Sequence, residues 1–208
     1  MLNVAVLASG SGSNLQALLD AEERGDLGAH IDLIVSNRRR AGALERARTA
    51  GREALHLSPR GFASDTEYCE RLLDILAAHH IAIVCLAGYL KKLPAAVVAS
   101  YPGRVLNIHP GPLPEFGGPG MYGREVHAAV LESGASYSGP TVHFVNEEYD
   151  RGPVAAHARV DVHLDDTPET LAARVLVEEH RLYPRVVAAL AAGRLRLEGD
   201  RVVGSLDA

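Results

Sequence analysis

Short apolar runs of strand length alternate with amphipathic runs of helix length over the first half of this chain. The runs at 3–8, 31–36, 54–58 and 81–87 are rich in Val, Ile, Leu and Ala, and the segments between them have helical periodicity. Parallel strands need a long crossover connection, which is usually a helix. The alternation therefore predicts an α/β fold: a Rossmann-like open, mostly parallel sheet with helices on both faces.

Local signals indicate where several helices begin and end. Leu15, Leu18 and Leu19 share one face of the helix expected after the first strand. Ser64 and Glu67 have the spacing of a capping box for a later helix. These signals place the helices between the strands, as the sheet requires.

The second half of the chain is less regular. Residues 110–123 are rich in Gly and Pro and fit no regular element, whereas 122–134 has a helical pattern. Thr167 and Pro168 suit the N-cap and first position of a long helix. Pro184 is expected to kink that helix or to end its first segment.

No repeat, charge tract or linker divides the chain, so we expect one folded unit. Residues 1–190 are predicted to form a single domain, with a phosphate-binding lobe at about 1–100 and a catalytic lobe at about 101–190. The tail, 191–208, is predicted to form a terminal hairpin.

Composition excludes several classes of function. The net charge of −5 and the absence of Trp argue against a nucleic-acid partner. No apolar stretch has the length of a membrane span, and no basic leader precedes the first strand, so we expect a soluble cytoplasmic protein without a membrane partner. Cys69 and Cys85 form no CxxC pair and are expected to be buried, reduced thiols.

A glycine-rich loop, ASGSGSNLQ at 8–16, connects the first strand to the first helix. Its glycines allow the backbone to approach a ligand, and the free N–H groups at the start of the helix attract an anion. We therefore expect this loop to bind a small phosphate monoester through Gly12, Ser13 and Asn14.

Besides a phosphate-monoester site, two alternatives remain open for this loop, of which the first is an NADP-binding site. A Walker A loop is excluded because no Gly-Lys-Ser/Thr follows at the required spacing. The dinucleotide fingerprint is incomplete because Leu15 occupies its third glycine position, although residues 38–40 are arginines that would suit the 2′-phosphate of NADP. The second alternative is a tight turn that binds no ligand.

The segment RVLNIHPGPLP, 104–114, places two polar residues at the end of an apolar strand. Asn107 and His109 are two residues apart, so their side chains point to the same face, at the edge of the sheet where α/β proteins bind ligands. An amide donor beside an imidazolium can stabilise an oxyanion, and the prolines that follow restrict the loop. An ordinary hydrogen-bonded histidine is the alternative.

Asp150 is the carboxylate expected to orient His109 and keep it protonated, because it occupies a tight turn just after another strand. His143 lies within that strand and either lines the same pocket or packs in the core. The remaining histidines show no metal-ligand spacing, so no metal site is predicted.

Four segments in this order, SGSGSNLQAL, CLAGYLKKLP, LNIHPGPLP and VHFVNEEYDRGP, resemble the phosphoribosylglycinamide formyltransferase family. The resemblance covers about residues 1–190. It implies that the chain transfers a formyl group from 10-formyltetrahydrofolate to the amine of 5′-phosphoribosylglycinamide in purine biosynthesis, with no metal. It also implies a formyltransferase fold, small-molecule partners and a monomer or homodimer.

The resemblance also implies a role for each matching residue. Asn107 and protonated His109 stabilise the oxyanion, and Asp150 raises the pKa of His109. The glycine-rich loop binds the substrate phosphate, and Glu179 contacts the ribonucleotide. The residues implied in folate binding are Leu90, Lys91, Lys92, Leu93, Asn107, Asn146, Glu147, Glu148, Tyr149 and Asp150.

The chain departs from the family at two places. Many relatives have HPSLLP and a shorter loop, so the course of residues 115–123 is left open. Asp65 occupies the position where some members carry an Arg for the folate glutamate tail, and Lys91 or Lys92 is the expected substitute.

Rival functions differ in what they require. A formyltetrahydrofolate deformylase shares the Asn/His/Asp chemistry but gives the formyl group to water, so a phosphate loop would have no use. A methionyl-tRNA formyltransferase would need an RNA-binding domain and more positive charge. A nucleotide-binding module without catalysis leaves the Asn/His/Asp set unexplained, and an NADP-binding oxidoreductase would bind nicotinamide.

Overall fold

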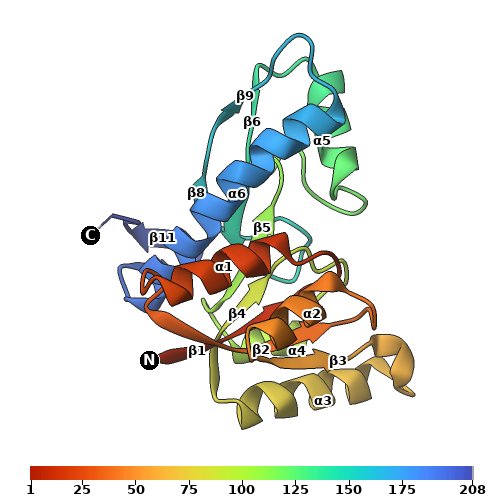
Figure 1. Ribbon diagram of the computed structural model, residues 1–208, viewed down its shortest axis with the longest axis vertical. Helices are drawn as coiled ribbons and strands as arrows, with labels where there is room; N and C mark the ends of the chain where they lie inside the picture. The colour runs from red at the N-terminus through yellow and green to blue at the C-terminus, as the bar shows by residue number, and fades with distance from the viewer. Residues whose placement is uncertain (208) are drawn as a thin grey trace.

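The computed structural model describes residues 1–207, whose main feature is a seven-stranded sheet (Figure 1). The strand order is β3-β2-β1-β4-β5-β7-β8. The strands are β1 (Leu2–Leu7), β2 (Ala29–Ser36), β3 (Glu53–His56), β4 (Ile81–Leu86), β5 (Val105–His109), β7 (Thr141–Phe144) and β8 (Val154–His157). The pairs from β3 to β5 are parallel, and β7 and β8 continue the sheet antiparallel. This confirms the open, mostly parallel sheet.

Helices cover both faces of this sheet. They are α1 (Ser13–Glu23), α2 (Gly42–Thr49), α3 (Asp65–Ala78), α4 (Ala95–Ser100), α5 (Arg124–Glu132) and α6 (Pro168–Ala191), with a 3₁₀ turn at Pro59–Gly61. Successive β1 residues face opposite ways, so Val4 and Val6 pack with α1, α2 and α6, whereas Ala5 and Leu7 pack with α3 and α4. The sheet is therefore buried on both faces, as its continuous apolar strands require.

Two small sheets complete the fold. β6 (Tyr137–Ser138) pairs with β9 (Val160–Asp161), beside the part of α6 that carries α5 (Figure 1). β10 (Leu195–Glu198) and β11 (Arg201–Gly204) pair antiparallel, which confirms the terminal hairpin; the last residue of the predicted tail lies outside the described residues. The large sheet runs unbroken through β4 and β5, so the predicted lobe boundary near residue 100 falls within one sheet, and the division into lobes stays a prediction.

Two local predictions hold only in part. α6 begins at Thr167 and Pro168 as expected, and it continues through Pro184 to Ala191, so of the two predicted effects of this proline, a kink or an end, the end is excluded. The buried face of α6 packs against the sheet, and this packing outweighs the hydrogen bond that proline cannot donate. At α3, Ser64 accepts from the Glu67 N–H, but the Glu67 carboxylate accepts from the Ala63 N–H, so only half of the capping box forms.

Neither cysteine forms a disulfide: Cys85 is buried and Cys69 is half-buried. No helix within residues 1–207 combines the length and the apolar character needed to cross a lipid bilayer.

Candidate active site

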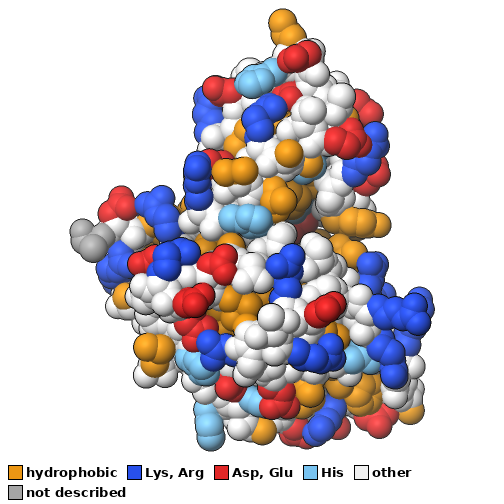
Figure 2. Space-filling view, viewed as in Figure 1, with side chains coloured by type: hydrophobic (Ala, Val, Ile, Leu, Met, Phe, Trp, Pro, Cys, Tyr) orange, Lys and Arg blue, Asp and Glu red, His pale blue; other side chains and the backbone are white. Residues whose placement is uncertain are grey.

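A cavity of about 890 Å³ opens at the carboxyl ends of β4 and β5. Leu90 to Leu93, just after β4, form one wall, and Asn107 and His109 at the end of β5 form its base. The waist of the molecule is hollowed in Figure 2, between the sheet and the part that carries α5. This is the edge of an open α/β sheet at which ligands bind.

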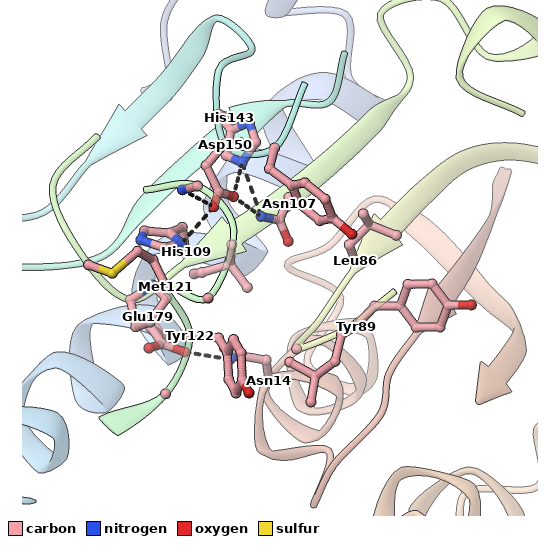
Figure 3. A pocket seen from close by; sticks show the side chains of 18 of the residues that line it. Asn14, Leu86, Tyr89, Asn107, His109, Met121, Tyr122, His143, Asp150 and Glu179 are labelled. Atoms are coloured by element: carbon pink, nitrogen blue, oxygen red, sulfur yellow. Dashed lines mark hydrogen bonds and ion pairs between the residues drawn. The ribbon is translucent and has the colours of Figure 1, made fainter. Parts of the chain in front are cut away.

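Asn107, His109, His143 and Asp150 converge in this cavity (Figure 3). The antiparallel register of β5 and β7 places Asn107 directly opposite His143. The Asn107 Nδ2 lies 3.0 Å from His143 Nε2 and 3.4 Å from Asp150 Oδ1. The structure thus brings the three predicted catalytic residues together and shows that His143 lines the same pocket.

The Asp150 carboxylate connects the cluster. Its Oδ2 lies 3.6 Å from His109 Nδ1 and accepts a hydrogen bond from the Gly118 N–H at 3.0 Å, while Oδ1 lies 3.5 Å from His143 Nε2. Burial alone would raise the pKa of Asp150, but the neighbouring His143, the hydrogen bond from the Gly118 N–H and the nearby His109 outweigh it and lower the pKa. Asp150 is therefore ionised at neutral pH. Its backbone is left-handed, with a φ of 53°, which is costly for an aspartate and typical of functional positions.

His143 is held in one tautomer by its neighbours. Its Nδ1 lies 2.9 Å from the Phe144 carbonyl, which can only accept, so Nδ1 carries the proton. In the neutral ring Nε2 is then free to accept from Asn107. His143 therefore orients the amide of Asn107.

His109 differs from the expectation that Asp150 keeps it protonated. The ring is only 3% exposed, and this burial lowers its pKa, although Asp150 and the Phe116 carbonyl both act to raise it. Its Nε2 lies 2.7 Å from the Phe116 carbonyl in the Gly/Pro-rich loop. Burial outweighs the carboxylate, so the ring is neutral at pH 7 before any substrate charge develops.

Asn14 and Glu179 form a second polar pair in the cavity (Figure 3). The Asn14 Nδ2 donates to Glu179 Oε2 at 2.5 Å, joining the start of α1 to α6. Burial raises the pKa of Glu179, and the Asn14 hydrogen bond opposes that rise. The pair leaves Asn14 Oδ1 without a partner among residues 1–207, which suits a ligand that donates a hydrogen bond.

The glycine-rich loop approaches α2 closely. Gly12 has a φ of 78°, and a Cβ there would lie 2.7 Å from Ala43 Cα, so only glycine fits. α1 begins immediately afterwards, with its first N–H groups free of helical partners. Asn14 lines the main cavity, but Gly12 and Ser13 do not; Ser13 lines a neighbouring cleft of about 340 Å³.

The two segments implied in folate binding face each other across the cavity mouth. All of Leu90 to Leu93 line it, and Lys92 Nζ lies 6.0 Å from the centroid of the Tyr149 ring. Asn146, Glu148 and Tyr149 also line the cavity, but Glu147 does not. Asp65, at the start of α3, is not part of this wall.

Sequence reasoning missed part of the wall. Most of its missed members come from the Gly/Pro-rich loop, from α5 and from the first turns of α6, and the others lie close to predicted residues in sequence. The first group is Gly118, Pro119, Gly120, Met121, Tyr122, Gly123, Arg124, His127, Pro168, Glu169, Ala172, Ala173 and Leu176, and the second is Leu86, Gly88, Tyr89, Ile108, Pro110 and Val145. Pro168 marked a helix start, but no sequence signal indicated that this start would face the catalytic residues. Within residues 1–207, no group of three or more His, Cys, Asp or Glu side chains is arranged to hold a metal ion.

The chain is similar to proteins of a known family over nearly its whole length. The family model described as formyl transferase matches residues 2–187. A chloroplastic phosphoribosylglycinamide formyltransferase of Arabidopsis thaliana is 46% identical over 96% of this chain and 68% of its own length. The Escherichia coli phosphoribosylglycinamide formyltransferase is 39% identical over 94% of this chain and 90% of its own. The crystal structure of glycinamide ribonucleotide transformylase 1 from Symbiobacterium toebii has a TM-score of 0.92 and 42% identity, covering 98% of this chain and 94% of its own.

Proposed function

The chain belongs to the formyl transferase family, and on this premise we propose that it transfers a formyl group from 10-formyltetrahydrofolate to the amine of 5′-phosphoribosylglycinamide. It is a formyltransferase of purine biosynthesis. The observation that carries the proposal is that Asn107, His109 and Asp150 line one cavity together with Leu90 to Leu93 and the Asn14–Glu179 pair.

Each substrate has a side of the cavity that suits its chemistry. The phosphate of the ribonucleotide belongs at the start of α1, where free N–H groups of Gly12 to Asn14 attract an anion. Glu179 accepts hydrogen bonds from ribose hydroxyls beside it. The folate belongs between Leu90–Leu93 and the segment 146–150, and the lysines at the mouth suit its anionic tail.

The amine of the ribonucleotide attacks the formyl carbon, and negative charge develops on the formyl oxygen. Asn107 donates a hydrogen bond to that oxygen, and His109 is the second donor. In the free enzyme His109 Nε2 donates to the Phe116 carbonyl, so the formyl oxygen takes the place of that carbonyl. The developing negative charge strengthens the hydrogen bond from the His109 Nε2–H, and ionised Asp150 stabilises the positive charge that builds up on the ring.

The proton balance involves two nitrogens. The attacking amine loses one proton as the new C–N bond forms, and N10 of tetrahydrofolate gains one as the old C–N bond breaks. Asp150 lies within 3.6 Å of two imidazoles and is ionised, so it is the group best suited to organise this transfer.

Hydrolysis to formate is not favoured as the main reaction. The relatives that match nearly the whole chain are named for transfer to phosphoribosylglycinamide. A deformylase would also have no use for the anion site that begins α1.

The test is release of tetrahydrofolate from 10-formyltetrahydrofolate by the purified protein, with and without the ribonucleotide. Release that depends on the ribonucleotide is the expected result. Equal release in its absence would make the protein a hydrolase and contradict the proposal.

A further inference from the structure

His127 is a buried polar side chain in the cavity wall that none of the steps above uses. It lies on α5, is 3% exposed, and lines the cavity. Its Nδ1 is buried without a hydrogen-bond partner anywhere in residues 1–207. An unpaired buried nitrogen lowers folding stability, so its presence in a cavity wall calls for an explanation.

The helix that carries this ring is firmly packed. Val126 and Val130 are fully buried, and Val130 belongs to a core cluster with Leu171 and Val175 of α6. The α5 backbone is therefore fixed against α6. The His127 ring is held in the wall by this packing and not by hydrogen bonds of its own.

The surroundings of the ring select one tautomer. A proton on Nδ1 would be a buried donor with no acceptor, which is the rarer and costlier arrangement. The proton therefore belongs on Nε2, the nitrogen that a molecule in the cavity can reach. Burial lowers the pKa of His127 and the nearby His109 lowers it further, so the ring is neutral at pH 7 and presents one N–H donor.

We propose that His127 is a substrate-binding residue whose Nε2–H donates a hydrogen bond to the amide carbonyl oxygen of the formyl acceptor. The proposal rests on the function proposed above. α5 packs on α6, the helix that also carries Glu179 on the ribonucleotide side of the cavity. The folate-side segments come from other elements, the loops after β4 and β7.

The amide carbonyl is the oxygen that suits this donor. Of the oxygens of the acceptor, it lies nearest along the chain to the reacting amine, and that amine must approach His109 during transfer. His127 is close enough to His109 for the His109 ring to disfavour charge on His127. A neutral donor there holds the glycinamide arm without competing with His109 for the oxyanion.

The test compares His127→Leu with His127→Gln. Leu has nearly the volume of His but no polar atom, so it should raise the melting temperature by removing the unpaired nitrogen. It should also lower kcat/KM for the ribonucleotide at least tenfold and leave KM for 10-formyltetrahydrofolate unchanged. Gln places an amide N–H near the position of Nε2 and should recover part of the lost kcat/KM. His56→Leu, on the exposed edge strand β3, is the matched control and should change neither quantity.

A lower melting temperature for His127→Leu with wild-type kinetics would show that the ring only fills space and would overturn the proposal. So would a raised KM for the folate with no change for the ribonucleotide. If the Leu variant does not fold, a His127→Gln variant without any kinetic recovery over His127→Ala decides against the proposal.

Binding without turnover separates this proposal from the function itself. The ribonucleotide should raise the melting temperature of the wild type more than that of His127→Leu, whether or not formyl transfer occurs. If the wild type binds the ribonucleotide but transfers no formyl group, the proposed function fails and the His127 contact stands. If both proteins bind it equally well, the His127 contact fails.

Discussion

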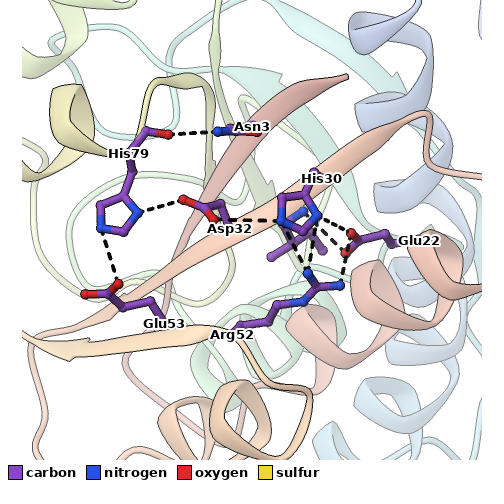
Figure 4. Close-up of polar contacts among 8 residues, drawn as sticks. Asn3, Glu22, His30, Asp32, Arg52, Glu53 and His79 are labelled. Carbon is purple, nitrogen blue, oxygen red and sulfur yellow. Dashed lines mark hydrogen bonds and ion pairs between the residues drawn. The ribbon is translucent and has the colours of Figure 1, made fainter.

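An aspartate lies between two histidines at both ends of the central sheet. At the carboxyl end it is Asp150, in the cavity. At the amino end it is Asp32, whose Oδ2 lies 2.6 Å from His79 Nδ1 and whose Oδ1 lies 3.7 Å from His30 Nε2 (Figure 4). The same two side-chain types therefore form a cluster at each end of the sheet, and the cluster around Asp150 lines the cavity described above.

The difference lies in burial and in the surrounding charges. At the amino end the side chains of His30, His79 and Asp32 are between 21% and 37% exposed, and Arg52 and Glu22 extend the network with an ion pair of 3.0 Å. Water screens such contacts. At the carboxyl end the rings of His109 and His143 are almost fully buried and line the cavity. The same residue types therefore support chemistry only where they are shielded from water and line a space that a substrate can fill.

The largest expected effect comes from removing the oxyanion donors of the carboxyl-end cluster. Asn107→Ala and His109→Ala should fold normally and each lose about 10²–10³-fold in kcat, as is typical for one such donor. Steady-state assays at saturating concentrations of both substrates measure this loss. Near-wild-type activity in either variant would contradict the claim that the carboxyl-end cluster stabilises the oxyanion.

Glu179→Gln should separate binding from chemistry within the same cavity. Gln still accepts the Asn14 hydrogen bond but loses the charge that favours ribose hydroxyls. KM for the ribonucleotide should rise by about tenfold, which corresponds to one hydrogen bond to a charged group. KM for the folate should not change. An equal rise in both KM values would mean that Glu179 supports the whole cavity.

The buried histidines should make stability depend on pH. The pKa values of His109 and His127 are lowered in the folded chain, so the unfolded chain binds more protons below about pH 6.5. Stability should therefore fall as the pH drops from 7.5 to 5.5, by up to about 1.4 kcal/mol per pH unit for each group. Urea unfolding should show a shallower dependence for His127→Leu. An identical slope in both proteins would contradict the burial of this ring.

The smallest effect is expected at the amino end. Asp32→Asn removes the charge between the two half-exposed histidines but keeps an acceptor oxygen. The free energy of unfolding should change by less than about 1 kcal/mol, because exposed ion pairs contribute little. kcat/KM should be unchanged for both substrates. A large loss of activity would show that the two ends of the sheet are coupled.

Much of the fold could be predicted because its signals are local. Continuous apolar strands, the Thr167–Pro168 helix start and the C-terminal hairpin all follow from periodicity and turn chemistry. Pro184 does not end the helix, because the buried face of α6 packs against a sheet that lies far away in sequence. Local propensity therefore fails where tertiary packing outweighs one missing hydrogen bond.

The site was predictable in its residue types but not in its electrostatics. Asn107 and His109 share a strand face, so their convergence follows from period-two geometry. The burial that lowers the pKa of His109 depends on how residues 110–123 cover it, and that loop has no regular pattern. The position of His127 in the wall depends on how α5 packs against α6, for which the sequence carries no signal.

The most direct test of the account is a single-turnover experiment with 10-formyltetrahydrofolate that carries a labelled formyl group. Wild type and Asp32→Asn should place the label on the ribonucleotide amine at equal rates, and Asp150→Asn should be slower by about 10²-fold or more. Label recovered as formate, or equal rates in all three proteins, would contradict the claim that the buried cluster at the carboxyl end performs formyl transfer.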